Sequence, residues 1–90
     1  MTHTILRLPA VNRATGNSRS THYLRITQGL FTKPVSIGPR AVGWPSSEVE
    51  AINAARIAGK TEEEIRALVL KLEAARKTAD QLPQLKGVLK

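Results

Sequence analysis

Apolar and polar positions between Leu8 and Gly29 follow two short helical stripes separated by a turn. Leu8 and Pro9 open the first stripe, because proline is tolerated at the first helical position, and Gly16 can end that helix in a left-handed cap. Ser18 is a natural N-cap for a second helix that runs to about residue 28, where Gly29 stops it. Two short helices joined by a glycine-containing turn predict a helix-turn-helix.

The pattern changes to a period of two after Gly29. Residues 33–37 and 40–44 indicate two strands, with Gly38 and Pro39 as the turn between them. We expect one face of this hairpin to be buried, and that face carries Val35, Ile37, Val42 and Trp44. A hairpin is marginal alone and needs a helix beneath it, and directly after a helix-turn-helix it forms a wing.

Two further helices follow the hairpin. Ser47 and Glu50 stand at capping-box spacing, which predicts a helix start, and Gly59 closes that helix. Thr61 and Glu64 form a second capping box, which opens a longer helix to about residue 80. Its apolar face consists of Ile65, Leu68, Val69 and Leu72.

The predicted fold is mainly α with a small β-hairpin, and its 90 residues suffice for one domain with a modest core. Residues 5–58 form the winged helix-turn-helix, residues 61–80 the C-terminal helix and residues 81–90 an apolar tail. The helix either packs on the domain or, with the tail, contacts a neighbouring copy. Four large aliphatic residues are more than a solubilising tail requires, so we expect a head-to-tail oligomerisation segment made by Leu82, Leu85, Val88 and Leu89.

Charge is distributed very unevenly along the chain. Residues 1–47 contain no Asp or Glu and carry six of the seven net positive charges. A carboxylate facing a phosphate is repelled at short range, so an acid-free region favours a polyanionic partner. The alternative is a basic surface kept for solubility, which normally mixes both signs.

Composition argues against several other classes. Without cysteine there are no disulfides, thiolate zinc sites or cysteine nucleophiles, and a lone aspartate with no glycine-rich phosphate loop makes an enzyme unexpected. His3 and His22 alone do not make a metal site, and we expect no cofactor. An RNA-binding or antitoxin-like protein would share the basic charge but would need exposed aromatic platforms. No apolar run approaches a membrane span or a signal peptide, so we expect a cytoplasmic protein.

Several segments, in this order, resemble the AlpA-like DNA-binding proteins. They are residues 6–9 (LRLP), 15–21 (TGNSRST), 29–31 (GLF), 38–44 (GPRAVGW) and 47–49 (SEV). That family comprises small winged-helix proteins related to phage excisionases and, more distantly, to the MerR DNA-binding domain. The resemblance implies a helix in the major groove, a wing at the adjacent minor groove, and a role in mobile elements. This chain departs from the family at His22 and Arg25, where many members are apolar, and at Thr32, where proline is common.

The first turn of the second helix supplies the first DNA-contact candidates, Ser18, Arg19, Ser20 and Thr21. A helix N-terminus offers free N–H groups to a phosphate. Arg19 can reach a phosphate or pair with the O6 and N7 atoms of guanine, whereas Ser18 serves mainly as the N-cap.

Arg25 is a further candidate for a groove or phosphate contact, and it shares a helix face with His22. For His22, a DNA contact and a hydrogen-bonded place at the core edge are equally plausible. We expect Tyr23 to face the core together with Ile26, Leu30 and Phe31, although its hydroxyl could reach a phosphate.

Lys33 and Arg40 flank the wing, and Arg40 follows its tip. An arginine there suits a narrow minor groove, and the alternative is a cation–π contact over a buried Trp44. Arg13, near the end of the first helix, is best interpreted as a clamp on the DNA backbone, while Arg7 is weakly placed.

The leading functional hypothesis is a sequence-specific excisionase, that is, a recombination directionality factor. Several copies would bind double-stranded attachment-site DNA and bias an integrase toward excision of a mobile element. The alternative is an AlpA-type transcriptional regulator of mobile-element genes, which would use the same protein surface.

Overall fold

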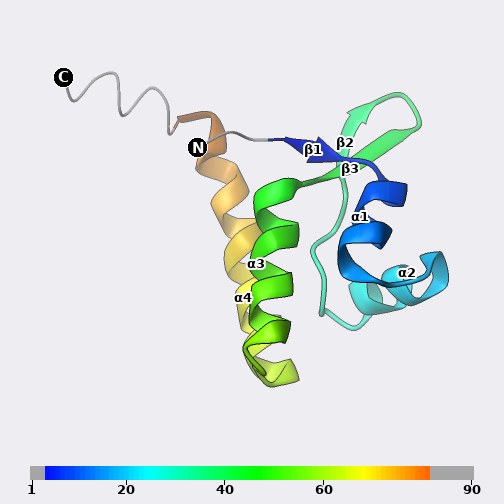
Figure 1. The fold of residues 1–90 in the computed structure, drawn as a ribbon. Coiled ribbons are helices and arrows are strands. Elements are labelled where there is room, and N and C mark those ends of the chain that lie inside the picture. The colour runs from blue at the N-terminus through cyan, green and yellow to red at the C-terminus, as the bar shows by residue number, and fades with distance from the viewer. Residues whose placement is uncertain (1–3, 82–90) are drawn as a thin grey trace.

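A computed structural model describes residues 4–81 (Figure 1). The elements follow the order β1 (Ile5–Leu6), α1 (Leu8–Thr15), α2 (Arg19–Thr27), β2 (Val35–Gly38), β3 (Ala41–Pro45), α3 (Ser46–Ile57) and α4 (Glu62–Ala75), and a 3₁₀ helix, η1, continues α4 over Arg76–Gln81. The predicted fold class, mainly helical with a wing behind a helix-turn-helix, is confirmed.

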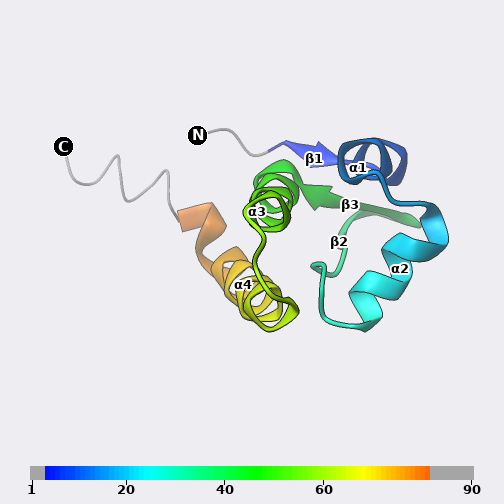
Figure 2. The same cartoon turned by 60° about the horizontal axis from the view of Figure 1, so that its bottom comes forward.

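The helices lie on both sides of a small antiparallel sheet. Figures 1 and 2 show α3 and α4 side by side, with α1 and α2 across the sheet from them. The strand order is β1-β3-β2, with Ile5 paired to Pro45 and Leu6 to Trp44. The strand β1 could not be predicted, because a strand of two residues leaves no periodic pattern in the sequence.

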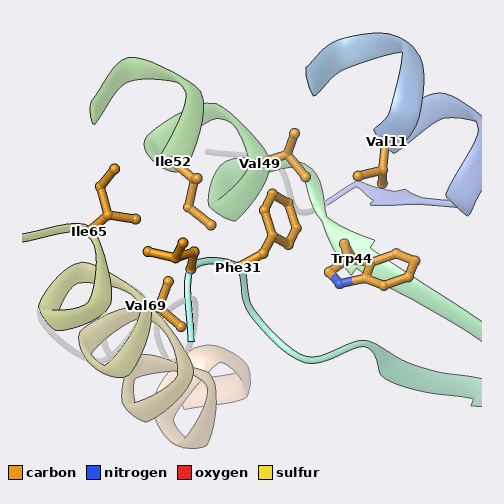
Figure 3. Close-up of a cluster of buried hydrophobic side chains, with 8 residues drawn as sticks. Val11, Phe31, Trp44, Val49, Ile52, Ile65 and Val69 are labelled. Atoms are coloured by element: carbon orange, nitrogen blue, oxygen red, sulfur yellow. The ribbon is translucent and has the colours of Figure 1, made fainter. Parts of the chain in front are cut away.

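The core joins α1, β3, α3, α4 and the segment that follows α2. Its buried apolar members are Val11, Leu30, Phe31, Trp44, Val49, Ile52, Ile65 and Val69 (Figure 3). Trp44 is fully buried as predicted, and its indole N–H donates to the Thr32 carbonyl oxygen at 2.9 Å. Since α4 contributes Ile65 and Val69 to the core, the long helix packs on its own domain. This was one of the two alternatives that the sequence left open for this helix.

Local signals placed most helix ends correctly. Gly16 adopts φ 77° and donates its N–H to Asn12 O, and Ser18 Oγ accepts the Thr21 N–H at 3.2 Å. The capping box of Thr61 and Glu64 is present in full.

The expected capping box of Ser47 and Glu50 is wrong. The helix α3 follows β3 directly, with Pro45 at the N-cap and no capping side chain. Glu48, not Glu50, is the buried acid of its first turn.

The expected buried face of the hairpin is correct only at its base. Ile37 and Val42 are 43% and 37% exposed, because the hairpin extends past the helices that cover Trp44 (Figure 1). The register also shifts between Ser36 and Gly38, which takes Ile37 out of the expected alternation.

The long C-terminal helix ends as an α-helix at Ala75, earlier than predicted, and continues as η1. Of the predicted apolar tail, residues 81–90, only Gln81 is described, at the end of η1, and the predicted oligomerisation residues Leu82, Leu85, Val88 and Leu89 lie outside the described residues. Within residues 4–81, no helix has the length and apolar character needed to cross a membrane.

Candidate nucleic-acid interface

A hollow of about 320 Å³ opens between the start of α1, the helix α2 and the wing. Arg7, Arg19 and Arg40 line it together with Tyr23, and Leu8, Pro9 and Val42 complete the wall. All three arginines are exposed, and no acidic residue lines the hollow. Three cations from separate parts of the chain thus converge on one concave surface, an arrangement that attracts a polyanion.

The N-terminus of α2 borders this surface through Arg19. Ser18 Oγ, besides capping the helix, lies 3.0 Å from Thr21 Oγ1 and 3.4 Å from Ser20 Oγ. These short hydroxyl side chains hydrogen-bond to one another, and Ser18 and Ser20 are exposed while Thr21 is half-buried, so a phosphate can approach the first turn closely.

Arg40 occupies the tip of the wing in an unusual backbone conformation. Its φ of 57° is the only positive φ of a non-glycine residue in the described part of the chain. Proline followed by a positive φ is the pattern of a type II turn, in which glycine or asparagine is favoured at the position of Arg40. The alternative of a contact between Arg40 and Trp44 is wrong, because Trp44 has no exposed surface and the cation–π contact found in residues 4–81 joins Arg19 to Tyr23.

His22 is fully buried, so its inclusion among the DNA contacts is a mistake that the structure corrects. Its ring packs edge-to-face on Phe31 and Trp44, with centroid distances of 4.8 and 4.6 Å. Neither ring nitrogen has a hydrogen-bond partner, and burial lowers the pKa of the imidazole. With His22 facing inward, Tyr23 turns outward to 37% exposure, so the expectation of a core tyrosine is also wrong.

The remaining basic candidates lie apart from the hollow. Lys33 lines a different groove, between α2 and α4, and Arg13 is exposed in the last turn of α1. Arg25 is half-buried near Arg56. The pKa of Arg56 is lowered, mainly because Arg56 is itself partly buried and secondly because the positive charge of Arg25 is close. The structure therefore brings Arg19 and Arg40 together with Arg7 and Tyr23, neither of which is among the DNA contacts predicted from the sequence. The sequence feature that could have indicated a role for Arg7 is its position directly before a helix that begins with Leu8 and Pro9.

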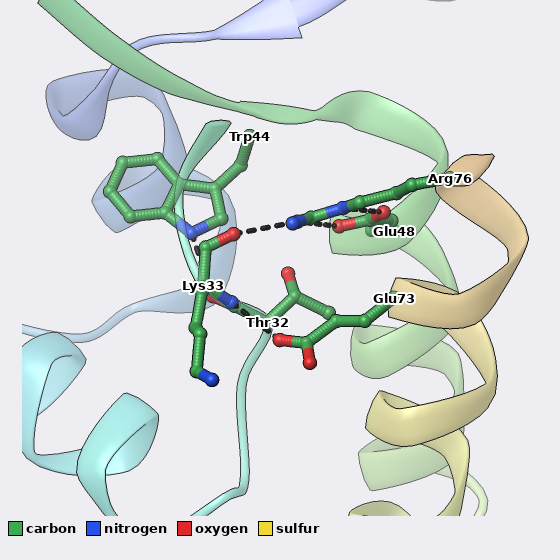
Figure 4. A network of polar contacts seen from close by, with 6 residues as sticks. All are labelled: Thr32, Lys33, Trp44, Glu48, Glu73 and Arg76. Atoms are coloured by element: carbon green, nitrogen blue, oxygen red, sulfur yellow. Dashed lines mark hydrogen bonds and ion pairs between the residues drawn. The ribbon is translucent and has the colours of Figure 1, made fainter. Parts of the chain in front are cut away.

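A polar network fixes the segment that joins α2 to the wing (Figure 4). Arg76 Nε and Nη2 donate to the Glu48 carboxylate at 2.8 and 2.7 Å, and Nη2 also donates to Lys33 O at 2.6 Å. Glu73 Oε2 accepts the Lys33 N–H at 2.8 Å. Arg66 Nε donates to Gln28 O at 2.9 Å, at the end of α2. The helix α4 and η1 thus hold the end of α2 and the start of the segment that leads to the wing at a set relative position.

No metal site accompanies this surface. Among residues 4–81, His, Cys, Asp and Glu side chains do not gather in any group of three or more that could hold an ion.

The chain is similar to a family of known proteins and to a phage protein. A family described as prophage CP4-57 regulatory protein (AlpA) matches residues 4–57. An uncharacterized protein of Enterobacteria phage P4, ORF88, is 49% identical over 55 residues, which are 61% of this chain and 62% of the relative. The chain thus matches less than two thirds of that relative's length. No solved structure matches.

Proposed function

The chain belongs to the AlpA family of prophage regulatory proteins, and from this premise we propose that it binds double-stranded DNA through the three-arginine hollow. The observation that carries the proposal is the convergence of Arg7, Arg19 and Arg40, without any acid, beside the N-terminus of α2.

In the proposed complex, α2 enters the major groove and the wing lies at the adjacent minor groove. Arg19 contacts a base edge or phosphate, and Arg40 at the wing tip enters the narrow groove. The hydroxyls of Ser18, Ser20 and Thr21 donate hydrogen bonds to phosphate oxygens that approach the N-terminus of α2. Arg13, Arg25 and Lys33 lie outside the hollow and would reach only flanking phosphates.

The proposed biological role is that of an excisionase. One such domain makes two or three base-edge contacts and therefore covers a short, degenerate site, so useful specificity requires several copies. Several copies on attachment-site DNA would bend or coat it and bias an integrase toward excision. The matched family is described as regulatory, which favours a second candidate function, transcriptional control of mobile-element genes through the same surface.

Footprinting on attachment-site and promoter DNA separates the two roles. Phased protections beside the integrase core sites support the excisionase, whereas protection confined to a promoter supports the regulator. If neither the attachment-site DNA nor the promoter DNA is protected, both proposed roles are contradicted. With about five phosphate contacts, raising salt from 50 to 200 mM should weaken binding roughly 10²–10³-fold.

Self-association on DNA is proposed to use the tail. The groove between α2 and α4, about 330 Å³ in volume, is lined by Ile26, Phe31, Val69 and Leu70 and can receive the aliphatic tail residues of a second copy. Leu70 is 69% exposed in the middle of α4. A net charge of +7 keeps free copies apart, and DNA removes that repulsion.

The absence of cysteine makes this contact easy to test. Leu70→Cys and Val88→Cys proteins, mixed on DNA under oxidation, should form a disulfide-linked dimer that neither variant forms alone. An intrachain bond in the double variant, with no dimer, would place the tail in its own groove and contradict the proposal. Deleting residues 82–90 should abolish cooperative binding and leave the fold intact.

A further inference from the structure

Tyr23 lies between the core and the proposed DNA surface. One side of its ring packs on the core, with the His22 centroid at 5.4 Å and the Trp44 centroid at 6.5 Å. The Arg19 guanidinium carbon lies 5.5 Å from the Tyr23 ring centroid, one helical turn away. A ring anchored in this way is a rigid support, whereas Arg19 itself is exposed.

We infer that Tyr23 is a positioning residue, which holds the guanidinium of Arg19 at the hollow before DNA arrives. The inference rests on the proposed DNA-binding function and assigns one specific part of it. A free arginine side chain samples many rotamers, and fixing it on DNA costs conformational entropy. Contact with an anchored ring removes part of that cost in the free protein.

An aromatic ring suits this task better than a carboxylate would. A salt bridge to Asp or Glu would neutralise Arg19 and compete with phosphate, and residues 1–47 contain neither acid. The salt bridges found within residues 4–81 join other arginines, Arg66 to Glu62 and Arg76 to Glu48. A guanidinium that stacks on a ring keeps its charge and leaves its N–H edges free for phosphate or guanine.

The competing explanation is that the Tyr23 hydroxyl contacts DNA directly. No hydrogen bond identified among the described residues involves that hydroxyl, so it is free for such a contact. Tyr23→Phe removes the hydroxyl and keeps the ring, while Tyr23→Leu removes the ring and keeps an apolar side chain against His22 and Trp44. The two substitutions therefore separate the explanations.

The test is a double-mutant cycle with duplex DNA titrated over a range of salt concentrations. Tyr23→Leu should weaken binding about two- to five-fold, the ratio expected for one exposed cation–π contact, while Tyr23→Phe stays near the wild type. The slope of affinity against salt should not change in Tyr23→Leu, because Arg19 still reaches the same phosphate. In an Arg19→Ala background, Tyr23→Leu should add no further loss.

Two results would overturn the inference. An equal loss in Tyr23→Phe would assign the effect to the hydroxyl, and a loss that persists in the Arg19→Ala background would assign it to the fold or to a direct contact. A DNA-free measurement distinguishes this failure from a failure of the proposed function. The Arg19 side-chain protons should show an upfield ring-current shift by NMR in wild type and Tyr23→Phe, and lose it in Tyr23→Leu, whether or not the protein binds duplex DNA.

Discussion

Replacing Arg76 by alanine should lower the stability of the domain by more than any other surface-charge change. The substitution deletes two hydrogen bonds to Glu48 and one to the Lys33 carbonyl oxygen. The Glu48 side chain is 6% exposed, so it cannot regain full hydration after its partner is removed.

The magnitude follows from the exposure of the two partners. Breaking a fully buried ion pair costs about 3–5 kcal/mol, because one charge stays buried alone. The Arg76 side chain is 23% exposed, so water reaches part of the site, and we expect about 2–3 kcal/mol. For a domain of this size that cost corresponds to a fall in Tm of roughly 10–20 °C.

Thermal unfolding followed by circular dichroism measures the effect. Lys77→Ala, an exposed neighbour of Arg76 on η1, is the matched control and should change Tm by only about 2 °C. In a Glu48→Gln background Arg76→Ala should cost clearly less, since the stranded charge is gone. If Arg76→Ala has the same Tm as the Lys77→Ala control, the network of Figure 4 does not hold α4 to the domain.

Three further predictions follow from the fold. Burial lowers the pKa of His22 below its usual 6.5, so the neutral buried ring contributes its full stability above pH 6.5. As the pH drops below 6.5, the free energy of unfolding should decrease by up to about 1.4 kcal/mol per pH unit, until the folded histidine is protonated. A His22→Leu variant should lose this pH dependence of Tm. Arg40→Gly should keep or raise Tm, since glycine relieves a left-handed backbone cost of about 1 kcal/mol, yet lower the salt slope of DNA binding by about 1. Gly43→Ala should cost about 1–3 kcal/mol in denaturant unfolding, because a Cβ there collides with Ile5 Cγ2 and lies 2.9 Å from Leu6 O.

Structural features that depend only on neighbouring residues could be predicted from the sequence. The left-handed cap at Gly16, the Ser18 N-cap and the Thr61 capping box each depend only on nearby backbone geometry. The hairpin was also predictable, because its turn residues lie between alternating strands.

Features that depend on distant partners could not be predicted. Glu48 and Arg76 are 28 residues apart, so no local sequence pattern shows that their side chains pair. The helix α2 has a weak apolar stripe, so the sequence could not show that His22, not Tyr23, faces inward. Arg7 joins the site because β1 pairs with β3, and two residues of strand carry no pattern.

The most direct test of the central claim compares the salt dependence of duplex binding among single alanine variants. Arg7→Ala, Arg19→Ala and Arg40→Ala remove the cations of the hollow, and Lys71→Ala removes an exposed cation of α4 as a matched control. If the hollow holds DNA, each of the three should lower the slope of log affinity against log salt by about 1, while Lys71→Ala leaves the slope unchanged. Equal slopes in all four variants and the wild type would show that DNA, if bound, lies on another surface.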